Sequence, residues 1–368
     1  MSTIMTASNQ WASRPDDQRF TSLTDLNDHL QLQRSNSRAK VVPSRSLFVE
    51  PAPDSDHRGL RLRGPDGNAV GLTHWSFSQL AQRAGAPAAY LRELPADLAS
   101  DNLNYGLQVS REVEDIGVLL YKNGGPAELR AVTGPQYGRV WNGEVSAALV
   151  DRFGDGINGH FRVPGEFGKR ITVTKANTTL YASDRDMFVF LADEDRRIEV
   201  PNRRNGQPGS LARGFFVWNS DTGGTSFGVA TFLFDYVCCN RIIWGANEYK
   251  ELRFAHNATA PARWIEQVAP ALEQYASGST ASVTAAIEAA RAAKLETDNV
   301  IDWLRSRKFT AKQAAGIAEV HLIEEMRPIE TLWDAATAIT AFARAVPHQD
   351  ERVRLERAAG AVMQLASA

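Results

Sequence analysis

Hydrophobic residues are densest in the middle of the chain, and their pattern predicts the centre of a β-sheet there. Apolar runs at 215–218 and 227–239 flank the polar, glycine-containing stretch 219–224. Branched and aromatic residues on either side of small, turn-forming residues are typical of a hairpin. In the second run both sets of alternate residues are mostly apolar, so both faces of this strand are expected to be covered.

The segments on either side of this hairpin predict helices and further strands. Before it, the pattern predicts a helix at 22–33 capped by Thr21 or Ser22, a hairpin of 47–49 with 60–62, helices between 73 and 107, a hairpin of 116–121 with 129–132, and a helix at 142–153. After residue 257, apolar residues recur every three or four positions, which predicts helices at 260–278, 282–304, 310–326, 331–346 and 350–366.

Together these elements predict an α+β protein. Its central, mainly antiparallel β-sheet is expected to span about residues 116–256, with helices before it and a helical region after it. We expect three parts: an N-terminal polar arm with a short helix and a β-hairpin (1–71), helices plus the central sheet (72–257), and a C-terminal helical region (258–368). Small residues at 279–293 permit close helix contact and a homo-oligomer, although helix packing within one chain has the same signature.

Composition and charge narrow the class of protein only slightly. With 368 residues, 43% of them hydrophobic, the chain is long enough to bury a substantial core. The formal charge is −2, but residues 162–263 hold 14 basic and 11 acidic side chains, so any bias toward anions is local to the sheet.

The chain start and the cysteines bear on location. The first residues lack the basic and apolar pattern of a signal peptide, and no run of 18 apolar residues occurs in the sequence, so no membrane contact is expected. Cys238 and Cys239 are adjacent, a spacing that favours neither a disulfide nor a metal site. A reducing, cytoplasmic location is the expectation.

Three blocks of residues carry a resemblance to a known family. They are Gly85, Pro87, Tyr90 and Leu91; Tyr137, Val140 and Asn142; and Val237, Cys238 and Asn240. In this order the blocks resemble the phage and plasmid-like family called domain of unknown function 932, over roughly residues 72–345. The chain departs from the family pattern at Cys239, Arg241 and Ile242, where relatives often have smaller or more polar residues.

The resemblance implies a product of a mobile genetic element, such as a phage or plasmid. It therefore implies a role in DNA transactions, recombination or evasion of host defence. The order of a strand-rich centre followed by helices is also similar to that of single-strand annealing proteins, a likeness of architecture that does not fix function.

Basic residues are the candidate nucleic-acid-binding side chains. Five arginines lie within the proline- and glycine-rich stretch 196–213, which has one acid, Glu199. Guanidinium groups on such a loop suit a phosphate backbone, because each neutralised phosphate releases a counterion, but a solvated hairpin loop has the same composition. A second basic stretch, 168–178, alternates like a strand. The full candidate set is Lys169, Arg170, Lys175, Arg196, Arg197, Arg203, Arg204, Arg213 and Arg241.

Aromatic residues next to the arginine-rich stretch are candidates for stacking on bases. They are Phe215, Phe216, Trp218 and Tyr236. Single-strand binders stack successive bases on such rings, whereas aromatic residues of strands also fill cores. Both interpretations stay open from the sequence.

Patterns that would indicate catalysis are weak. The seven histidines have no metal-ligand spacing and no phosphate-binding loop motif occurs, so neither a metal nor a cofactor is expected. Five acids, Asp184, Asp186, Asp193, Glu194 and Asp195, could hold Mg²⁺, but turns are also rich in aspartate. The polar stretch 219–221 is either a binding corner or a turn whose side chains satisfy backbone groups.

These observations lead to one functional hypothesis and two alternatives. The hypothesis is a non-enzymatic protein of a mobile element that binds or anneals single-stranded nucleic acid, DNA or RNA, as a homo-oligomer. One alternative is an interaction protein that inhibits or recruits a host factor through its helical region. The other is a metal-dependent nuclease that uses the acids at 184–195.

Overall fold

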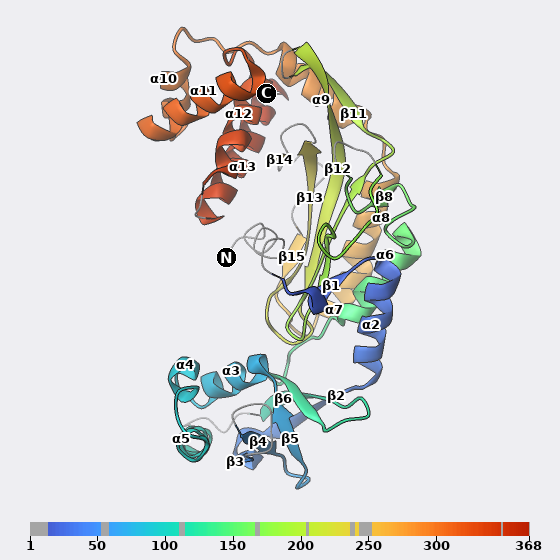
Figure 1. The fold of residues 1–368 in the computed structure, drawn as a ribbon, viewed down its shortest axis with the longest axis vertical. Coiled ribbons are helices and arrows are strands. Elements are labelled where there is room, and N and C mark those ends of the chain that lie inside the picture. The colour runs from blue at the N-terminus through green and yellow to red at the C-terminus, as the bar shows by residue number, and fades with distance from the viewer. Residues whose placement is uncertain are drawn as a thin grey trace.

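Two β-sheets, each packed against helices, form two lobes (Figure 1). The computed structural model describes residues 14–52, 59–109, 115–165, 170–203, 206–235, 240–242, 252–346 and 349–367. The predicted α+β class and mainly antiparallel pairing are confirmed. Within the described ranges, none of the helices has both the length and the apolar character needed to cross a membrane.

The larger sheet is built around the predicted hairpin. Its strands are β1 (Arg19–Phe20), β8 (Phe161–Arg162), β9 (Leu180–Ala182), β10 (Met187–Asp193), β11 (Ile198–Arg203), β12 (Gln207–Asn219), β13 (Phe227–Asp235), β14 (Asn240–Ile242) and β15 (Leu252–Phe254). The main path runs β1-β9-β10-β12-β13-β14, with β8 on β10, β11 on β12 and β15 on β13. Phe232 and Leu233 of β13 are adjacent, point to opposite faces and are each 3% exposed, so the expectation of two covered faces is confirmed for this strand.

The smaller sheet contains strands that the sequence analysis placed in the central sheet. Its strands are β2 (Ser37–Pro43), β3 (Phe48–Pro51), β4 (Leu60–Arg63), β5 (Ala69–Leu72), β6 (Asp115–Tyr121) and β7 (Glu128–Thr133), in the order β2-β6-β7-β5-β4-β3. The predicted hairpins β3–β4 and β6–β7 are confirmed. The prediction that one sheet spans 116–256 is wrong, because β6 pairs with β2 and β7 pairs in parallel with β5. A hairpin signal is local and does not say which sheet the hairpin joins.

Helices cover both sheets and form the C-terminal region. They are α2 (Leu23–Ser35), α3 (His74–Arg83), α4 (Ala88–Leu91), α5 (Ala96–Val109), α6 (Asn142–Phe153), α7 (Ala260–Arg263), the π-helical η4 (Trp264–Val268), α8 (Ala269–Ser277), α9 (Ala281–Ala292), α10 (Val300–Ser306), α11 (Ala311–Glu325), α12 (Leu332–Arg344) and α13 (Gln349–Gln364), with short 3₁₀ turns η1 (Asp16–Gln18), η2 (Ser44–Ser46) and η5 (Leu365–Ser367). The Ser22 hydroxyl accepts a hydrogen bond from the Asp25 amide and caps α2, as predicted.

One predicted helix is divided in two. The chain leaves the helical conformation between α9 and α10, where the Leu295 amide donates to the Glu330 carbonyl. The Asn299 side chain then accepts hydrogen bonds from the first amides of α10 and starts a new helix. The small residues of α9 pack within the chain, since Val283, Ile287 and Ala290 belong to the core shared with α12.

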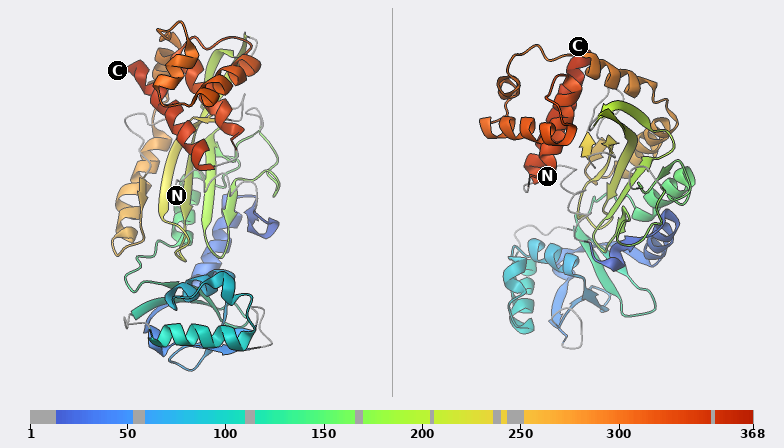
Figure 2. Two further views of the ribbon diagram at one scale, coloured as in Figure 1. Left: turned by 90° about the vertical axis from the view of Figure 1, so that its left-hand side faces the viewer. Right: turned by 45° about the horizontal axis from the view of Figure 1, so that its top comes forward.

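The smaller lobe is an insertion in the larger one. Residues 37–133 leave α2 through β2 and return through β7 to α6. The two flanking helices pack side by side in the larger lobe, where Gln31 Nε2 donates to the Gly143 carbonyl at 2.8 Å and Arg34 pairs with Glu144 at 2.6 Å. Figure 2 shows the smaller lobe and the C-terminal helices at opposite ends of the molecule.

Candidate functional site

Two of the predicted nucleic-acid-binding arginines are structural, and Arg203 is the clearer case. Its side chain is 1% exposed, and its Nη2 lies 2.8 Å from Glu325 Oε1 on α11. The guanidinium also lies over the Trp333 ring, 5.6 Å from its centre. The buried ion pair fastens the edge strand β11 to the C-terminal helices, so the prediction that Arg203 contacts nucleic acid is wrong.

Arg213 is buried in the same way. Its Nη2 lies 3.2 Å from Asp193 Oδ2, and both side chains are at most 1% exposed. Its Nη1 donates to the carbonyls of Tyr275 and Gly278 at the end of α8. Arg213 is therefore shielded from any nucleic acid. The prediction that it binds nucleic acid is wrong, as it is for Arg203.

The other basic candidates are dispersed. Arg196 is exposed, and the partly exposed Arg197 donates to the Glu194 carbonyl of its own turn. Arg170 and Lys175 are exposed on a loop instead of the predicted strand, because the Asn177 side chain accepts from Thr174 N and donates to Thr172 O. Of the remaining candidates, Lys169 and Arg204 lie outside the described residues, as does the side chain of Arg241.

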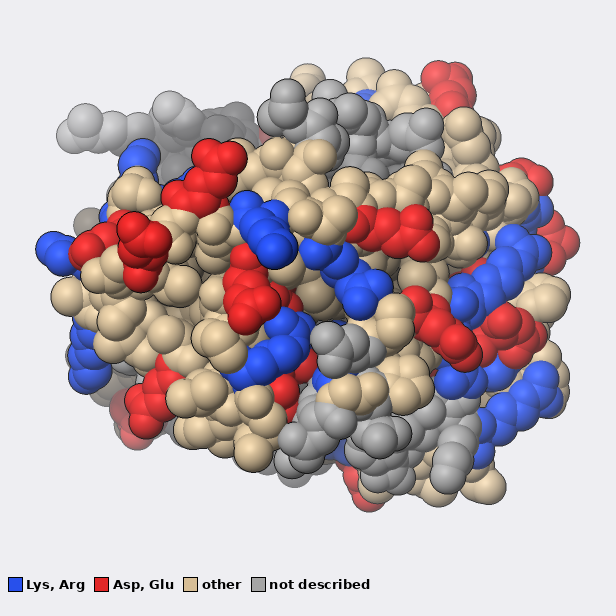
Figure 3. All heavy atoms as spheres, turned by 90° about the horizontal axis from the view of Figure 1, so that it is seen from above, with Lys and Arg blue, Asp and Glu red and all other residues tan. Residues whose placement is uncertain are grey.

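The surface near the arginine-rich stretch is of mixed charge. Figure 3 views the end of the molecule that carries the C-terminal helices and the end of β11. On this face the Lys and Arg side chains are interspersed with Asp and Glu, and the described residues form no continuous basic band. A phosphate backbone is bound by a continuous run of basic side chains. This end of the molecule is therefore a poor candidate for binding a nucleic-acid strand.

The stacking candidates and the acidic candidates are also engaged elsewhere. Phe215, Phe216 and Trp218 are at most 2% exposed, so the prediction that they stack on bases is wrong, and Tyr236 lies outside the described residues. The acids separate into different ion pairs: Asp186 with Arg14, Asp193 with Arg213, Glu194 with Arg197, and Asp195 with Arg162. Asp195 Oδ2 also lies 2.8 Å from His160 Nδ1, and Asp184 is exposed. Among the described residues, no three His, Cys, Asp or Glu side chains are grouped to hold a metal.

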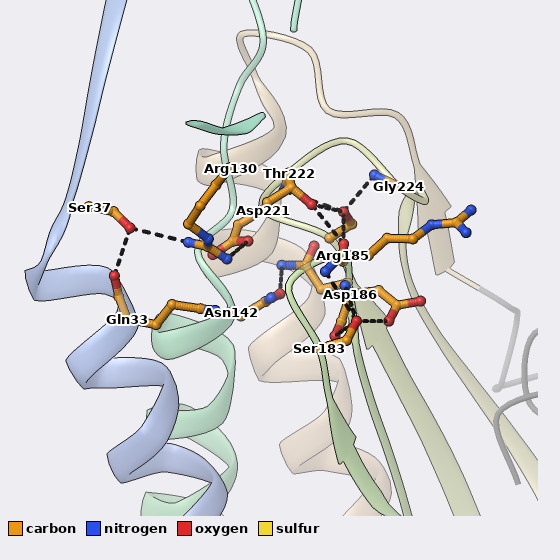
Figure 4. A network of polar contacts seen from close by, with 12 residues as sticks. Gln33, Ser37, Arg130, Asn142, Ser183, Arg185, Asp186, Asp221, Thr222 and Gly224 are labelled. Carbon is orange, nitrogen blue, oxygen red and sulfur yellow. Dashed lines mark hydrogen bonds and ion pairs between the residues drawn. The ribbon is translucent and has the colours of Figure 1, made fainter. Parts of the chain in front are cut away.

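The polar turn of the central hairpin is buried between the two sheets (Figure 4). We call residues 219–224 the inter-sheet turn; its first four residues are at most 2% exposed. Ser220 Oγ and Thr222 Oγ1 both donate to the Arg185 carbonyl, and Ser220 Oγ accepts from the Gly224 amide at 2.6 Å. The side chains thus satisfy the turn's own backbone, as one interpretation of this stretch expected.

The inter-sheet turn also binds the smaller lobe. Arg130 of β7 pairs with Asp221 at 3.3 Å, with both side chains 3% exposed. The Thr222 carbonyl accepts from Trp75 Nε1 at 3.1 Å and from Gln79 Nε2 at 2.8 Å, both on α3. This contact was missed in the sequence analysis, because nothing local in 219–224 indicates a partner about 90 to 150 residues away.

A cavity of about 480 Å³ lies beside this turn. Its polar lining residues are Ser44, Gln79, Gln82, Arg83, Thr133 and Tyr137, and an apolar wall of Leu107, Ile116 and Val132 is completed by Gly134 and Gly223. Gly223 has a positive φ of +86°, and a Cβ there would lie 3.2 Å from Gln79 Nε2. The turn can therefore approach α3 closely because residue 223 is a glycine.

Tyr137 forms the wall between the cavity and a buried cationic corner. We use this name for Arg130, Tyr137, Arg139, Asp221 and His256. The Tyr137 hydroxyl donates to the Ser220 carbonyl at 2.8 Å, and its ring stacks on His256 with centres 4.9 Å apart. The Arg139 guanidinium lies 5.1 Å from the centre of the same ring. Tyr137 thus contacts His256 and Arg139 and also lines the cavity.

Burial controls protonation in the cationic corner. Burial lowers the pKa of His256 to about 4, with Arg139 adding to the effect, so the imidazole is neutral at pH 7. Burial also raises the pKa of the Tyr137 hydroxyl, which stays protonated. The corner therefore holds two guanidinium groups against one carboxylate, Asp221, and has an excess of positive charge.

Two cavity residues, Ser44 and Thr133, have buried hydroxyl groups. Ser44 and Thr133 are 7% and 6% exposed, and neither Ser44 Oγ nor Thr133 Oγ1 has a hydrogen-bond partner among the described residues. A buried polar group without a partner costs about 1–3 kcal/mol, so such groups need an explanation. Both residues belong to the wall of one cavity, although the two oxygen atoms themselves have almost no accessible surface.

The fold and this cavity define an α+β protein with a polar, cation-biased site between two sheets. No family model, no curated protein and no solved structure matches the chain. The resemblance to domain of unknown function 932 therefore stays a prediction. Its second block, Tyr137, Val140 and Asn142, lies at this site, and Asn219 Nδ2 donates to both the Val140 carbonyl and Asn142 Oδ1.

Proposed function

We propose that the protein binds single-stranded nucleic acid without chemical turnover, at the inter-sheet cavity instead of the arginine-rich stretch. The observation that carries the proposal is the charge of the lining. Arg83 is the one ionisable cation among the described lining residues, and no carboxylate is among them. Anions are favoured where a guanidinium group belongs to the lining and the described lining residues include no carboxylate.

The surface next to the cavity supports a path for a strand. Trp75, Gln79 and Arg83 follow one another at intervals of four residues, so they lie along one face of α3 over about 12 Å. The exposed Arg185 guanidinium lies 4.4 Å from the centre of the partly exposed Trp75 ring. The guanidinium groups of Arg185 and Arg83 therefore lie at the two ends of this face, with the Gln79 side-chain amide between them.

The available chemistry favours phosphate and sugar over base recognition. The aromatic rings of β12 are in the core, and the Tyr137 ring already stacks on His256 and has the Arg139 guanidinium 5.1 Å from its centre. Contacts to phosphate carry no base information, so binding is expected to be independent of sequence. DNA and RNA strands of one sequence, compared directly, would show whether the sugar contributes.

The test is fluorescence anisotropy of a labelled, mixed-sequence single strand over a salt series. Log affinity should fall linearly with log salt, with a slope of about −0.7 for each neutralised phosphate. Arg83→Gln should weaken binding and flatten the slope by about 0.7, whereas Arg305→Gln, an exposed arginine in the C-terminal region, should change neither.

Two outcomes decide against the proposal. No binding by the parent protein at low salt would remove the nucleic-acid function. Binding that is unaffected by Arg83→Gln would remove the cavity from the interface. Light scattering on each variant tests the proposed homo-oligomer and ensures that affinities are compared at one subunit number; a host protein as partner stays a prediction from the resemblance.

A further inference from the structure

We infer that the protein assembles head to tail, with the outer face of α5 in one copy packed against the outer face of α11 in the next copy. This inference rests on the homo-oligomer of the proposed function and names the two surfaces that form it. The smaller lobe holds α5 and the C-terminal region holds α11, and these parts lie at opposite ends of the molecule (Figure 2). A contact between two different surfaces leaves one of each free, so it continues into a ring or a filament.

The helix α5 is apolar on two opposite sides. On one side Leu103 and Leu107 are buried in the core of the smaller lobe. On the other side Leu98, Tyr105 and Val109 are 52%, 72% and 52% exposed, and their spacing of seven and four residues places them on one line along the helix. A surface helix normally has a polar face there. Single exposed apolar residues are common, but a line of them along one helix indicates a contact surface.

A second exposed line with the same spacing lies on α11. Leu322 and Met326 at its C-terminal end are 55% and 62% exposed, and the exposed Ala315 lies two turns earlier. Each line has one polar residue at the same place, and it is exposed in both. The α5 row is Leu98, Asn102, Tyr105 and Val109, and the α11 row is Ala315, Glu319, Leu322 and Met326.

Equal spacing allows the two rows to pack side by side along their whole length. In a parallel alignment Tyr105 lies against Leu322, and Asn102 lies against Glu319. The Asn102 Nδ2 group donates one hydrogen to the Leu98 carbonyl at 2.7 Å, which leaves its second hydrogen for the Glu319 carboxylate. The parallel alignment therefore pairs polar with polar and apolar with apolar, whereas an antiparallel one would set Glu319 against the Tyr105 ring.

The charges beside the rows favour α11 over a second α5 as the partner surface. Asp97 and Asp101 are exposed in the first half of α5, which contains no Lys or Arg. Lys308 and Lys312 are exposed where α11 begins. A two-fold contact of α5 with itself would bring its acids together, whereas the parallel contact with α11 brings the acids of one copy near the lysines of the next.

Sedimentation of the full-length protein tests the assembly. One helix against one helix is a small contact, so the mass should equal one chain at about 1 μM and exceed it at about 100 μM. Leu98→Gln combined with Tyr105→Gln should stay a monomer at both concentrations. Leu322→Gln combined with Met326→Asn should do the same, and Asn suits the left-handed backbone at residue 326, where φ is +59°.

A matched control separates the rows from exposed apolar residues in general. Ile265 on η4 is 66% exposed and belongs to neither row, so Ile265→Gln should assemble like the parent. All the substituted side chains are exposed, so the urea midpoint of every variant should stay close to that of the parent. Assembly of the parent with no change in either row variant overturns the inference.

Mixing the two row variants separates a head-to-tail contact from a two-fold one. The α5-row variant keeps an intact α11, and the α11-row variant keeps an intact α5. Their mixture at about 100 μM should therefore form a dimer and nothing larger. A mixture that stays monomeric overturns the inference, and so does an α11-row variant that still assembles, since α5 would then pair with itself.

A charge exchange tests which residues face each other. Asn102→Asp sets a second carboxylate against Glu319 and should weaken assembly by about tenfold. Adding Glu319→Lys to the same chain should restore it, because the new carboxylate then faces an ammonium group. Absence of this rescue overturns the parallel alignment of the rows.

Fluorescence anisotropy with a labelled single strand separates this inference from the proposed function. A parent protein that is monomeric at about 100 μM and binds the strand overturns head-to-tail assembly and leaves strand binding standing. Assembly that follows the expected pattern of variants without binding of any strand supports the inference and overturns strand binding. A monomer that binds no strand overturns both.

Discussion

Two buried polar regions lie toward opposite ends of the long hairpin of β12 and β13, and they use arginine differently. Toward the β11 end, Arg203 and Arg213 each meet a carboxylate from another element. At the inter-sheet turn, Arg130 meets Asp221, but Arg139 adds a second cation. A balanced pair fastens elements together, whereas an excess of one charge beside a cavity favours a ligand of the opposite charge.

The largest effect is expected from breaking the balanced region. Arg203→Ala leaves the Glu325 carboxylate buried without its partner, which should lower the free energy of unfolding by about 3–5 kcal/mol in urea denaturation. Arg305→Ala, which removes an exposed arginine from the same region, should change it by less than about 0.5 kcal/mol. A small loss of stability together with weakened strand binding would restore Arg203 to the interface.

Asp221→Asn in the cationic corner should lower the stability of the protein and raise its affinity for an anionic strand. The amide keeps the shape of the side chain but removes the charge that balances buried Arg130, which should cost about 2–3 kcal/mol of stability. Because the single carboxylate of the corner is lost, affinity for an anionic strand at low salt should rise. Denaturation and anisotropy on the same preparation measure both quantities, and a parallel fall in stability and affinity would contradict the charge-excess model.

A smaller effect should appear in the pH dependence of stability. Burial lowers the pKa of His256 to about 4 from 6.5, so the unfolded state binds a proton in this window and the folded state does not. Stability from this residue is complete above pH 6.5 and is lost as the pH falls toward 4, by up to about 1.4 kcal/mol per pH unit. In His256→Gln the free energy of unfolding should lack this pH dependence. Equal slopes for the two proteins would mean that His256 is protonated in the fold.

The smallest effect is expected for Arg196→Gln combined with Arg197→Gln. Both residues lie at the turn between β10 and β11, where Arg196 is exposed and Arg197 is partly exposed and pairs with Glu194, and neither lines the inter-sheet cavity. Strand affinity should stay within about twofold of the parent, below the level that a single lost contact would produce. A tenfold loss with a flatter salt slope would return the interface to this turn.

Local features were predictable from the sequence, and long-range ones were not. The Ser22 cap and the hairpin of β12 with β13 were predicted because each depends on neighbouring residues. The division into two sheets was missed, since β6 pairs with β2 nearly 80 residues earlier in the chain. Arg203 was assigned to binding because the sequence shows its charge but not Glu325, which is 122 residues away.

The candidate site was hidden for the same reason. Ser44, Arg83, Thr133 and Gly223 come from four separate segments, and no two of them form a motif. Tyr137 was noticed, but as part of a family resemblance and without a role. A buried hydroxyl without a partner is visible only once the surrounding atoms are placed, so Ser44 and Thr133 carried no signal in the sequence.

The insertion of the smaller lobe has a consequence for the order in which the protein folds. All six strands of the smaller sheet have been synthesised by residue 133, so this lobe can close while the ribosome is still translating. The larger sheet must wait longer, because β1 near the chain start pairs with β9, where Arg19 lies opposite Tyr181. Contacts between residues so distant in sequence form slowly. The helices that flank the insertion, α2 and α6, are therefore expected to pack against each other after the small lobe has closed, and the inter-sheet turn is expected to bind the small lobe last.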